Sequence, residues 1–476
     1  MKLSEVTSKF VMNAYQLNDD MPFSVETING KELLCSKRLD IVAKMKYLEL
    51  KDISIEFAKS LYLEHIRVMT KDSFIEAGSN KTKAQDFIDA FVKLYEDMKE
   101  NGFREDLFPV PVDKNGVILD GAHRVACSIV LNIPVKVVKL PIEAIYDNYD
   151  YSYFEQHLME EDYLDYLVLE YIKEKNNIGC INIWPSAVGH DEEVKNILND
   201  NFEIVYYKEV SLNENGAFQY LAQIYKEYSW AQNNGDGFSG VYRKLLPCFP
   251  TFNPVRVYFI ATDDYAKVTA IKEKIRDIFG LEKHSLHATD NYEETLEMSE
   301  ILLNDNTIQF LNQSNPLQFN TTIPLLEEAK KYDVKRTIFT GSIVLALYGI
   351  REANDLDYVT LDDDPESHND LLEYYGSNVL EMLNNPVKTF TYFGFRFLTL
   401  EEIIQFKKNR NESKDRDDIK LIQLFLSDNK KNNKIKWIQV KRRMIAKTQG
   451  VILKVAHKTG TYDFLRAVYK KIKGAH

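Results

Sequence analysis

The sequence predicts a multidomain protein of the α+β class, and three observations carry this prediction. The chain has 476 residues, more than one hydrophobic core usually serves, so about three domains are expected. Apolar residues make up 45% and aromatic residues 12% of the chain, which is enough to fill packed cores and argues against disorder. Short strand patterns and amphipathic helix patterns alternate along most of the sequence.

Composition also narrows the class of protein. No run of about 18 apolar residues occurs, and the start, MKLSEVTSKFVMNAYQ, lacks the apolar core of a secretory signal, so we expect a cytoplasmic protein. The four cysteines show neither a CxxC spacing nor a metal-ligand pattern with histidine. A disulfide framework or a structural zinc site is therefore not expected.

The charge is distributed unevenly along the chain. Residues 430–476 contain fourteen Lys or Arg and one acid, a net charge of +13, so the rest must carry −25 to reach the total of −12. The acidic body disfavours nucleic acid, and no specific nucleic acid is expected as a partner. The tail, residues 429–476, predicts a basic amphipathic helix. It either contacts an anionic membrane at the inner surface or packs on the acidic body.

The first predicted domain, residues 1–145, ends in FPVPVDKNGVILDGAHRVACSIVLNIPVKVVKL. PVPV, VILD and PVKVV are expected strands, and a helix is expected to begin after Asp120. Gly121, His123 and Arg124 would then offer N–H donors and a cation to a phosphate. Upstream, Glu76 and Lys81 offer a carboxylate and a cation to the same pocket. The alternative is that all of these are helix caps and surface charges.

This Gly-x-His-Arg turn resembles the ParB/sulfiredoxin-like family, whose members carry Gly-x-x-Arg at the same place. Some members bind DNA or CTP, some reduce sulfinic acids, and some phosphorylate free serine. The resemblance implies that Gly121, His123, Arg124 and Lys81 bind phosphate. It implies a catalytic role for Glu76.

Residues 146–178 are rich in tyrosine and acids and predict a helical linker. The next domain, residues 179–312, alternates strands and helices in an order that suits a ferredoxin-like α/β sandwich. Near its end, KHSLHATD precedes the helical pattern YEETLEMSEILL. His287 in this string is either a nucleophile or a structural residue before a helix that Thr289 or Asp290 caps.

The string resembles the active-site segment of nucleoside diphosphate kinases. The resemblance implies that His287 accepts a phosphoryl group while a carboxylate orients its other ring nitrogen, and that Arg276 meets a phosphate. The family has Lys-Pro-Asp on its first strand. Here those positions read Trp184-Pro185-Ser186.

The domain at residues 313–428 contains TIFTGSIVLALYGIREANDLDYVTL. Asp355 and Asp357, at i and i+2 of an expected strand, would share one face and could hold Mg²⁺ or Mn²⁺. Gly341 and Ser342 open the preceding helix and could supply N–H donors to a nucleotide phosphate. The alternative is an edge strand with two solvated aspartates.

With Arg351 before the acidic strand, this pattern resembles the DNA polymerase beta-like nucleotidyltransferases. The resemblance implies that Asp355 and Asp357 are catalytic metal ligands and that CTP or ATP is the substrate. It also implies that Arg351, Lys407, Arg410 and Lys414 bind the nucleotide phosphates. The alternative is a solvated charged helix face. The third carboxylate of the family has no counterpart in VKTFTYFGFRF.

We therefore expect a cytoplasmic transferase of phosphorus-containing groups. It would activate a small phosphorylated or hydroxylated molecule with a nucleotide, as in the synthesis of precursors for capsule polysaccharide or lipid. Three alternatives stay open. They are a nucleic-acid-directed nucleotidyltransferase or ParB-like DNA-binding protein, a non-catalytic nucleotide-binding scaffold, and a glycan phosphotransferase at the membrane surface.

Overall fold

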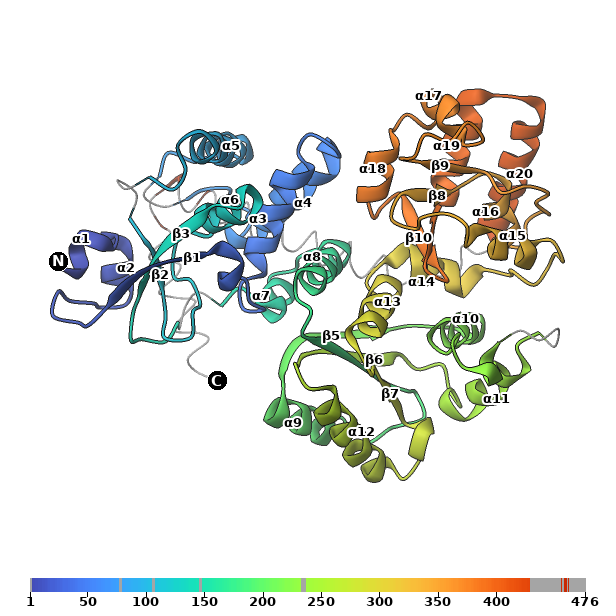
Figure 1. Cartoon of the computed structure of the whole chain (residues 1–476), viewed down its shortest axis with the longest axis horizontal. Coiled ribbons are helices and arrows are strands. Elements are labelled where there is room, and N and C mark those ends of the chain that lie inside the picture. Colours follow the sequence, from blue (N-terminus) through green and yellow to red (C-terminus); the bar gives the residue numbers. More distant parts are fainter. Residues whose placement is uncertain are drawn as a thin grey trace. The chain divides into compact units, whose positions relative to one another are not determined.

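The computed structural model describes residues 2–76, 79–104, 108–144, 148–232 and 237–428, with residues 455, 458, 459 and 461. This part contains 20 α-helices and three small sheets, which confirms a mixed α+β protein with more than one domain (Figure 1). The predicted basic tail, residues 429–476, lies outside the described residues apart from the four isolated positions. Among the described residues, no helix combines the length and the apolar character that a membrane span requires.

The chain forms two compact units, one up to Leu167 and one from Val168 to Lys430, so the boundary falls within α8. The first unit has a three-stranded sheet in the order β1-β3-β2, with β1 antiparallel and β2 parallel to β3. Its elements are α1 (Leu3–Val6), α2 (Lys9–Ala14), β1 (Ser24–Asn29), α3 (Leu39–Leu50), α4 (Ile55–Met69), α5 (Ala84–Asn101), β2 (Val110–Val112), α6 (Ala122–Leu131), β3 (Pro134–Lys139), α7 (Tyr151–Gln156) and part of α8 (Glu161–Glu174).

Two of the three strands predicted at the end of this domain are present, as β2 and β3. The expected strand VILD is not formed, and only Ile118 makes a single bridge to Val112. The backbone oxygen of Ile118 instead accepts a hydrogen bond from the Arg38 guanidinium, which occupies a position that a sheet partner would need.

Arg38 belongs to a buried cluster of charges beneath this turn. Asp40 accepts hydrogen bonds from Arg38 at 2.8 and 2.9 Å and from Lys44 at 2.8 Å, although all three side chains are at most 3% exposed. Lys44 also donates to Nε2 of the buried His65, at 3.0 Å. Burial lowers the pKa of Lys44, against the opposing charge of Asp40. The cluster ties α3 to α4 through charges that need one another.

Replacing Asp40 by Ala is expected to destabilise the first unit by about 3–5 kcal/mol, because two buried cations lose their counter-charge. The control Glu49→Ala removes a partly exposed partner of Lys46 and should cost at most about 1 kcal/mol. Hydrogen exchange of α3 and α4 amides in the full-length chain measures both effects. Equal losses of protection in the two variants would contradict the assigned role of Asp40.

The second unit contains a four-stranded antiparallel sheet in the order β5-β6-β4-β7. The chain follows a strand-helix-strand, strand-helix-strand path, in the element order that the sequence predicts. The strands are β4 (Ile178–Ile183), β5 (Glu203–Val210), β6 (Val255–Ala261) and β7 (Leu286–Ala288). The helices and short 3-10 turns around them are α9 (Asp191–Asn201), α10 (Glu214–Ile224), η2 (Ser229–Ala231), α11 (Ser239–Cys248), α12 (Tyr265–Phe279), η3 (Glu282–His284) and α13 (Tyr292–Leu302).

The two faces of this sheet are covered differently. Apolar residues of α9 and α12 pack with alternate residues of β4, β6 and β7, among them Ile181, Ile260 and Leu286, in one buried core. Helices α10 and α13 lie on the opposite face (Figure 1). Asn182 points to that second face and accepts a hydrogen bond from Tyr220 of α10 at 3.3 Å. His287 is paired with Asn182 across the strands and therefore shares this face.

The second sheet of this unit has the order β10-β11-β8-β9, with β8 parallel to β11 and the other pairs antiparallel. The segment VKTFTYFGFRF forms an antiparallel hairpin of β10 and β11. The predicted acidic strand is shorter than expected, because β9 begins only after Asp357. The elements are α14 (Asp305–Gln313), α15 (Thr322–Ala329), β8 (Thr337–Phe339), α16 (Ser342–Leu347), β9 (Tyr358–Thr360), η4 (His368–Leu371), α17 (Leu372–Tyr375), α18 (Val379–Asn384), β10 (Thr389–Tyr392), β11 (Phe395–Leu398), α19 (Leu400–Arg410) and α20 (Ser413–Asp428).

Buried side chains of α10 join the sheet β10-β11-β8-β9 to the sheet β5-β6-β4-β7. Gln219 accepts a hydrogen bond from the Tyr392 hydroxyl at 2.8 Å, and Gln223 accepts one from the Phe393 backbone N–H at 2.8 Å. Both glutamines are at most 4% exposed. Thr307 of α14 accepts a further hydrogen bond from Thr391 N–H at 3.0 Å. The two sheets are therefore held in one compact unit.

Candidate functional site

His287 is held by the start of helix α13. Its Nε2 lies 2.9 Å from Oε1 of Glu294, while the other carboxylate oxygen accepts the backbone N–H of Asp290 at 2.7 Å. Asn291, not Thr289 or Asp290, caps the helix by accepting the N–H of Glu294 at 2.8 Å. A neutral imidazole can donate to Glu294 only when its proton is on Nε2, so this contact favours the tautomer in which Nδ1 keeps its lone pair. Nδ1 faces the hydroxyl of Tyr225 at 3.4 Å.

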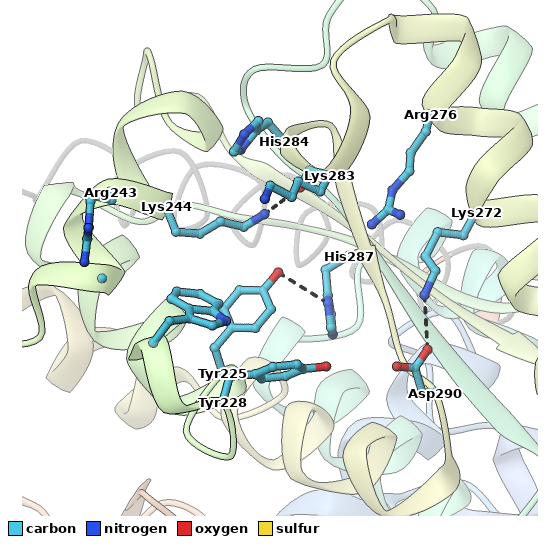
Figure 2. A pocket seen from close by; sticks show the side chains of 12 residues that line it. Tyr225, Tyr228, Arg243, Lys244, Lys272, Arg276, Lys283, His284, His287 and Asp290 are labelled. Atoms are coloured by element: carbon cyan, nitrogen blue, oxygen red, sulfur yellow. Dashed lines mark hydrogen bonds and ion pairs between the residues drawn. The ribbon is translucent and has the colours of Figure 1, made fainter. Parts of the chain in front are cut away.

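Nδ1 looks into a cavity of about 460 Å³, which we call the histidine cavity (Figure 2). Side chains from η2, α11, α12 and η3 surround it. The described residues that line it are Tyr225, Tyr228, Trp230, Gly240, Arg243, Lys244, Lys272, Arg276, Lys283, His284, His287 and Asp290.

Positive charge dominates the histidine cavity. Five of the described lining residues are Lys or Arg, and one, Asp290, is acidic. Asp290 pairs with Lys272 at 3.1 Å, and Arg276 pairs with Glu273 at 2.7 Å. Burial lowers the pKa of Lys244, and the nearby positive charges of Lys283 and Arg276 lower it further. Crowded cations of this kind favour an anionic ligand.

Aromatic rings form one wall of the histidine cavity. The ring centroid of Tyr225 lies 5.1 Å from that of Trp230 and 5.8 Å from that of Tyr228. Gly240 makes this wall possible, because a Cβ there would lie 1.7 Å from the backbone oxygen of Trp230. Rings in such an arrangement offer a stacking surface for a planar group, such as a nucleobase.

Sequence reasoning found part of this site. His287 and Arg276 are brought together as predicted, and Glu294 is the carboxylate on the imidazole. The cations of α11 and η3 and the aromatic wall were missed, because they come from segments with no local motif. Trp184 lies outside the cavity lining. It is fully buried, its ring packs on Phe249, and its Nε1 finds no hydrogen-bond partner among the described residues.

The predicted metal cassette assembles around Ser342. Its Oγ donates to Asp355 at 3.1 Å, and its backbone N–H donates to Asp357 at 3.3 Å. His368 contacts the other oxygen of Asp357 at 3.2 Å. Burial alone would raise the pKa of Asp357, but the hydrogen bond and charge of His368 and the N–H of Ser342 lower it overall. Both aspartates therefore contact Ser342, although they precede the strand that was expected to hold them.

The cations predicted to reach a triphosphate here make ion pairs with other acids. Arg351 holds Asp418 with two hydrogen bonds of 2.7 and 3.0 Å, and Lys407 bridges Asp415 and Asp418 at 3.3 and 2.7 Å. The remaining two predicted cations are also paired, Arg410 with Asp415 at 2.7 Å and Lys414 with Glu412 at 3.2 Å. The bonds of Lys407 and Arg410 hold α19 against α20, and the bonds of Arg351 hold the segment after α16 to α20. In the described part of the chain, no group of three or more His, Cys, Asp or Glu could hold a metal.

In the first unit, the residues predicted to bind phosphate do not all lie around one site. Arg124 donates to the backbone oxygen of Phe108 and folds over Gly121, which has a φ of +90°. Nε2 of His123 lies 3.0 Å from the Tyr62 hydroxyl, and the pKa of His123 lies well below the ordinary value because of burial and of nearby cations such as Lys44 and Lys81.

The remaining two predicted residues of this unit, Glu76 and Lys81, pair with each other at 2.8 Å. Lys81 also lies over the ring of Phe87, 5.1 Å from its centroid. The positive charge of Lys81 also lowers the pKa of His123. The Arg124 guanidinium, in contrast, donates to the backbone oxygen of Phe108.

Comparison of the chain with protein-family models, curated proteins and solved structures yields no match.

Gly341→Ala is expected to disturb the metal cassette, because a Cβ at this position would lie 2.0 Å from Oδ2 of Asp357. Gly102→Ala is the matched control, since its backbone angles (φ +68°, ψ −162°) are close to those of Gly341 (φ +68°, ψ −133°) but no atom lies within 4 Å of its Cβ. Both variants should lose about 1–3 kcal/mol to backbone strain, and Gly341→Ala should lose about 1–3 kcal/mol more to the clash. Hydrogen exchange of the amides in the unit that contains each substitution measures the two losses. Identical losses would show that Asp357 moves aside freely.

Proposed function

We propose that this chain is a phosphotransferase that binds a nucleoside phosphate in the histidine cavity and accepts its terminal phosphoryl group on His287. The pairing of His287 with Glu294 beside five cations is the observation that carries this proposal. A buried imidazole with one nitrogen held by a carboxylate and the other facing a cationic cavity is suited to nucleophilic attack on phosphorus.

The reaction has two balanced steps. Nδ1 of His287 attacks the terminal phosphorus, an N–P bond forms, and the P–O bond to the leaving diphosphate breaks with its electron pair on oxygen. An acceptor oxygen then attacks the same phosphorus, and the N–P bond breaks in turn. Glu294 stabilises the imidazolium through Nε2–H in the first step. The cations balance the charge of the phosphates.

The topology of the sheet β5-β6-β4-β7, which carries His287, supports the same proposal. In chain order, its strands lie as fourth, first, third and second, all antiparallel, with two helices packed on one face. This is the arrangement of a ferredoxin-like sandwich, the fold expected for a domain of the nucleoside diphosphate kinase type. One fold can serve many functions, so the proposed mechanism rests on the residues of the site and not on the fold.

His287→Ala is expected to abolish acid-labile label from [γ-³²P]ATP, because the nucleophilic nitrogen is gone. His284→Ala is the matched control, since His284 lines the same cavity but has no comparable carboxylate contact on the described residues. It should retain most of the label. Glu294→Gln should slow labelling by about 10–100-fold through loss of a charged hydrogen bond. Persistent label on His287→Ala would overturn the proposal.

A second activity, nucleotidyl transfer, is favoured by the convergence of Asp355 and Asp357 on Ser342. These carboxylates suit a hard cation, so Asp355 and Asp357 would hold Mg²⁺ or Mn²⁺, which would neutralise nucleotide phosphates. Ser342 orients both aspartates through its hydroxyl and N–H. The small phosphorylated acceptor and the use of CTP or ATP belong to this proposal, and so does a role in precursor synthesis for a polysaccharide or lipid.

The double change Asp355→Asn and Asp357→Asn should eliminate Mg²⁺-dependent pyrophosphate release from CTP or ATP in the presence of phosphorylated polyols. Asp363→Asn removes an exposed carboxylate shortly after β9 and should leave the rate unchanged. Coupled detection of pyrophosphate measures both. Activity that survives the double change would show that these aspartates do not take part in the reaction. That result would leave the proposal for His287 untouched, because its test is the labelling of His287.

A further inference from the structure

The cations of the histidine cavity come from two different sides. Lys272 and Arg276 project from α12, while Lys244 and Lys283 project from α11 and η3, and His287 lies between these two sets in Figure 2. We call Lys244 and Lys283 the lysine pair. The amine of Lys244 donates to the backbone oxygen of Lys283, which brings the two residues together.

The two sets differ in how far acids neutralise them. Lys272 faces Asp290 at 3.1 Å and Arg276 faces Glu273 at 2.7 Å, so each α12 cation has a carboxylate partner. Among the described residues that line the cavity, no acid lies in an ion pair with the lysine pair. The lysine pair is therefore the less compensated of the two sets. Burial is the main cause of the lowered pKa of Lys244, and the positive charges of Lys283 and Arg276 lower it further.

The lysine pair also stands on the aromatic side of the cavity. The Lys244 amine lies 5.6 Å from the ring centroid of Tyr225, whose hydroxyl reaches His287. In a ligand whose planar group stacks on Tyr225 and Trp230, the inner phosphates would lie beside the lysine pair and the terminal phosphoryl group would lie at His287. The order of groups along the cavity matches the order of groups along a nucleoside polyphosphate.

We propose that the lysine pair stabilises the polyanionic leaving group when His287 is phosphorylated, and so restricts the donor to phosphoanhydrides. This inference rests on the phosphotransferase proposed above. As the P–O bond breaks, the bridging oxygen takes the electron pair and the departing diphosphate gains one negative charge. Two ammonium groups beside that oxygen lower the energy of the transition state more than that of the bound donor.

A donor with a neutral leaving group isolates this effect. Phosphoramidate transfers its phosphoryl group to an imidazole as its P–N bond breaks and ammonia departs without negative charge. The same attack by Nδ1 therefore occurs, with the same N–P bond formed, but it needs no cation at the leaving group. His287, Glu294 and the α12 cations serve both donors equally.

The experiment compares the labelling rate of His287 from ATP and from phosphoramidate in the full-length chain. The double change Lys244→Gln and Lys283→Gln should slow labelling from ATP by at least about tenfold, the effect of losing a charge-assisted contact. Labelling from saturating phosphoramidate should slow far less than labelling from ATP, because its neutral leaving group needs no cation. Lys274→Gln removes an exposed α12 charge outside the cavity lining and should change neither rate.

The outcomes separate the two proposals. Equal rates from ATP in wild type and the lysine variant overturn the role of the lysine pair and leave the phosphotransferase standing. Equal slowing with both donors also overturns it, because the pair would then act on His287 or on the fold. If neither donor labels wild-type His287, the phosphotransferase itself is wrong.

Discussion

The contact between His287 and Glu294 is the interaction on which the candidate site depends. Both oxygens of Glu294 are used, one by the imidazole and one by the backbone N–H of Asp290. The carboxylate is therefore positioned by the first turn of α13 and not by a flexible side chain alone. Because it favours the tautomer of His287 with its proton on Nε2, it leaves Nδ1 as the nitrogen that faces the cavity. Without this contact, the cations nearby would surround a ring of undefined tautomer.

Helix α10 links the histidine cavity to the sheet β10-β11-β8-β9. Gln219 and Gln223 lie on its buried side and accept hydrogen bonds from Tyr392 and Phe393. The helix ends at Ile224, and the next residue is Tyr225, whose ring lines the cavity. A buried amide without its partner would cost about 1–3 kcal/mol, so the end of α10 is held firmly. The second sheet thus supports the aromatic wall, whatever reaction its own aspartates perform.

The sequence predicted those parts of the site that one segment encodes. His287 and Glu294 lie within eight residues of each other, and Ser342 with Asp357 spans a single strand-helix-strand turn. The helix cap was predicted at Thr289 or Asp290, but Asn291 caps the helix. Lys244 and the aromatic wall come from a segment without a motif, and only tertiary packing brings them to His287. Lys407 and Arg410 differ from these cases. The family resemblance predicted that they bind phosphate, and in the structure they form ion pairs with Asp415 and Asp418, which no local sequence pattern indicated.

The contrast between the cavity and the whole chain argues for a small ligand. Residues 1–429 carry a net charge of −25, yet five cations and one acid line the histidine cavity. At physiological salt, charges more than about 8 Å apart are largely screened, so a small anion inside the cavity responds mainly to the cations near it. A long polyanion would leave the cavity and run across the acidic surface, where each further phosphate is repelled. The charge distribution therefore selects by size as well as by sign, which favours a nucleotide or phosphate ester over nucleic acid.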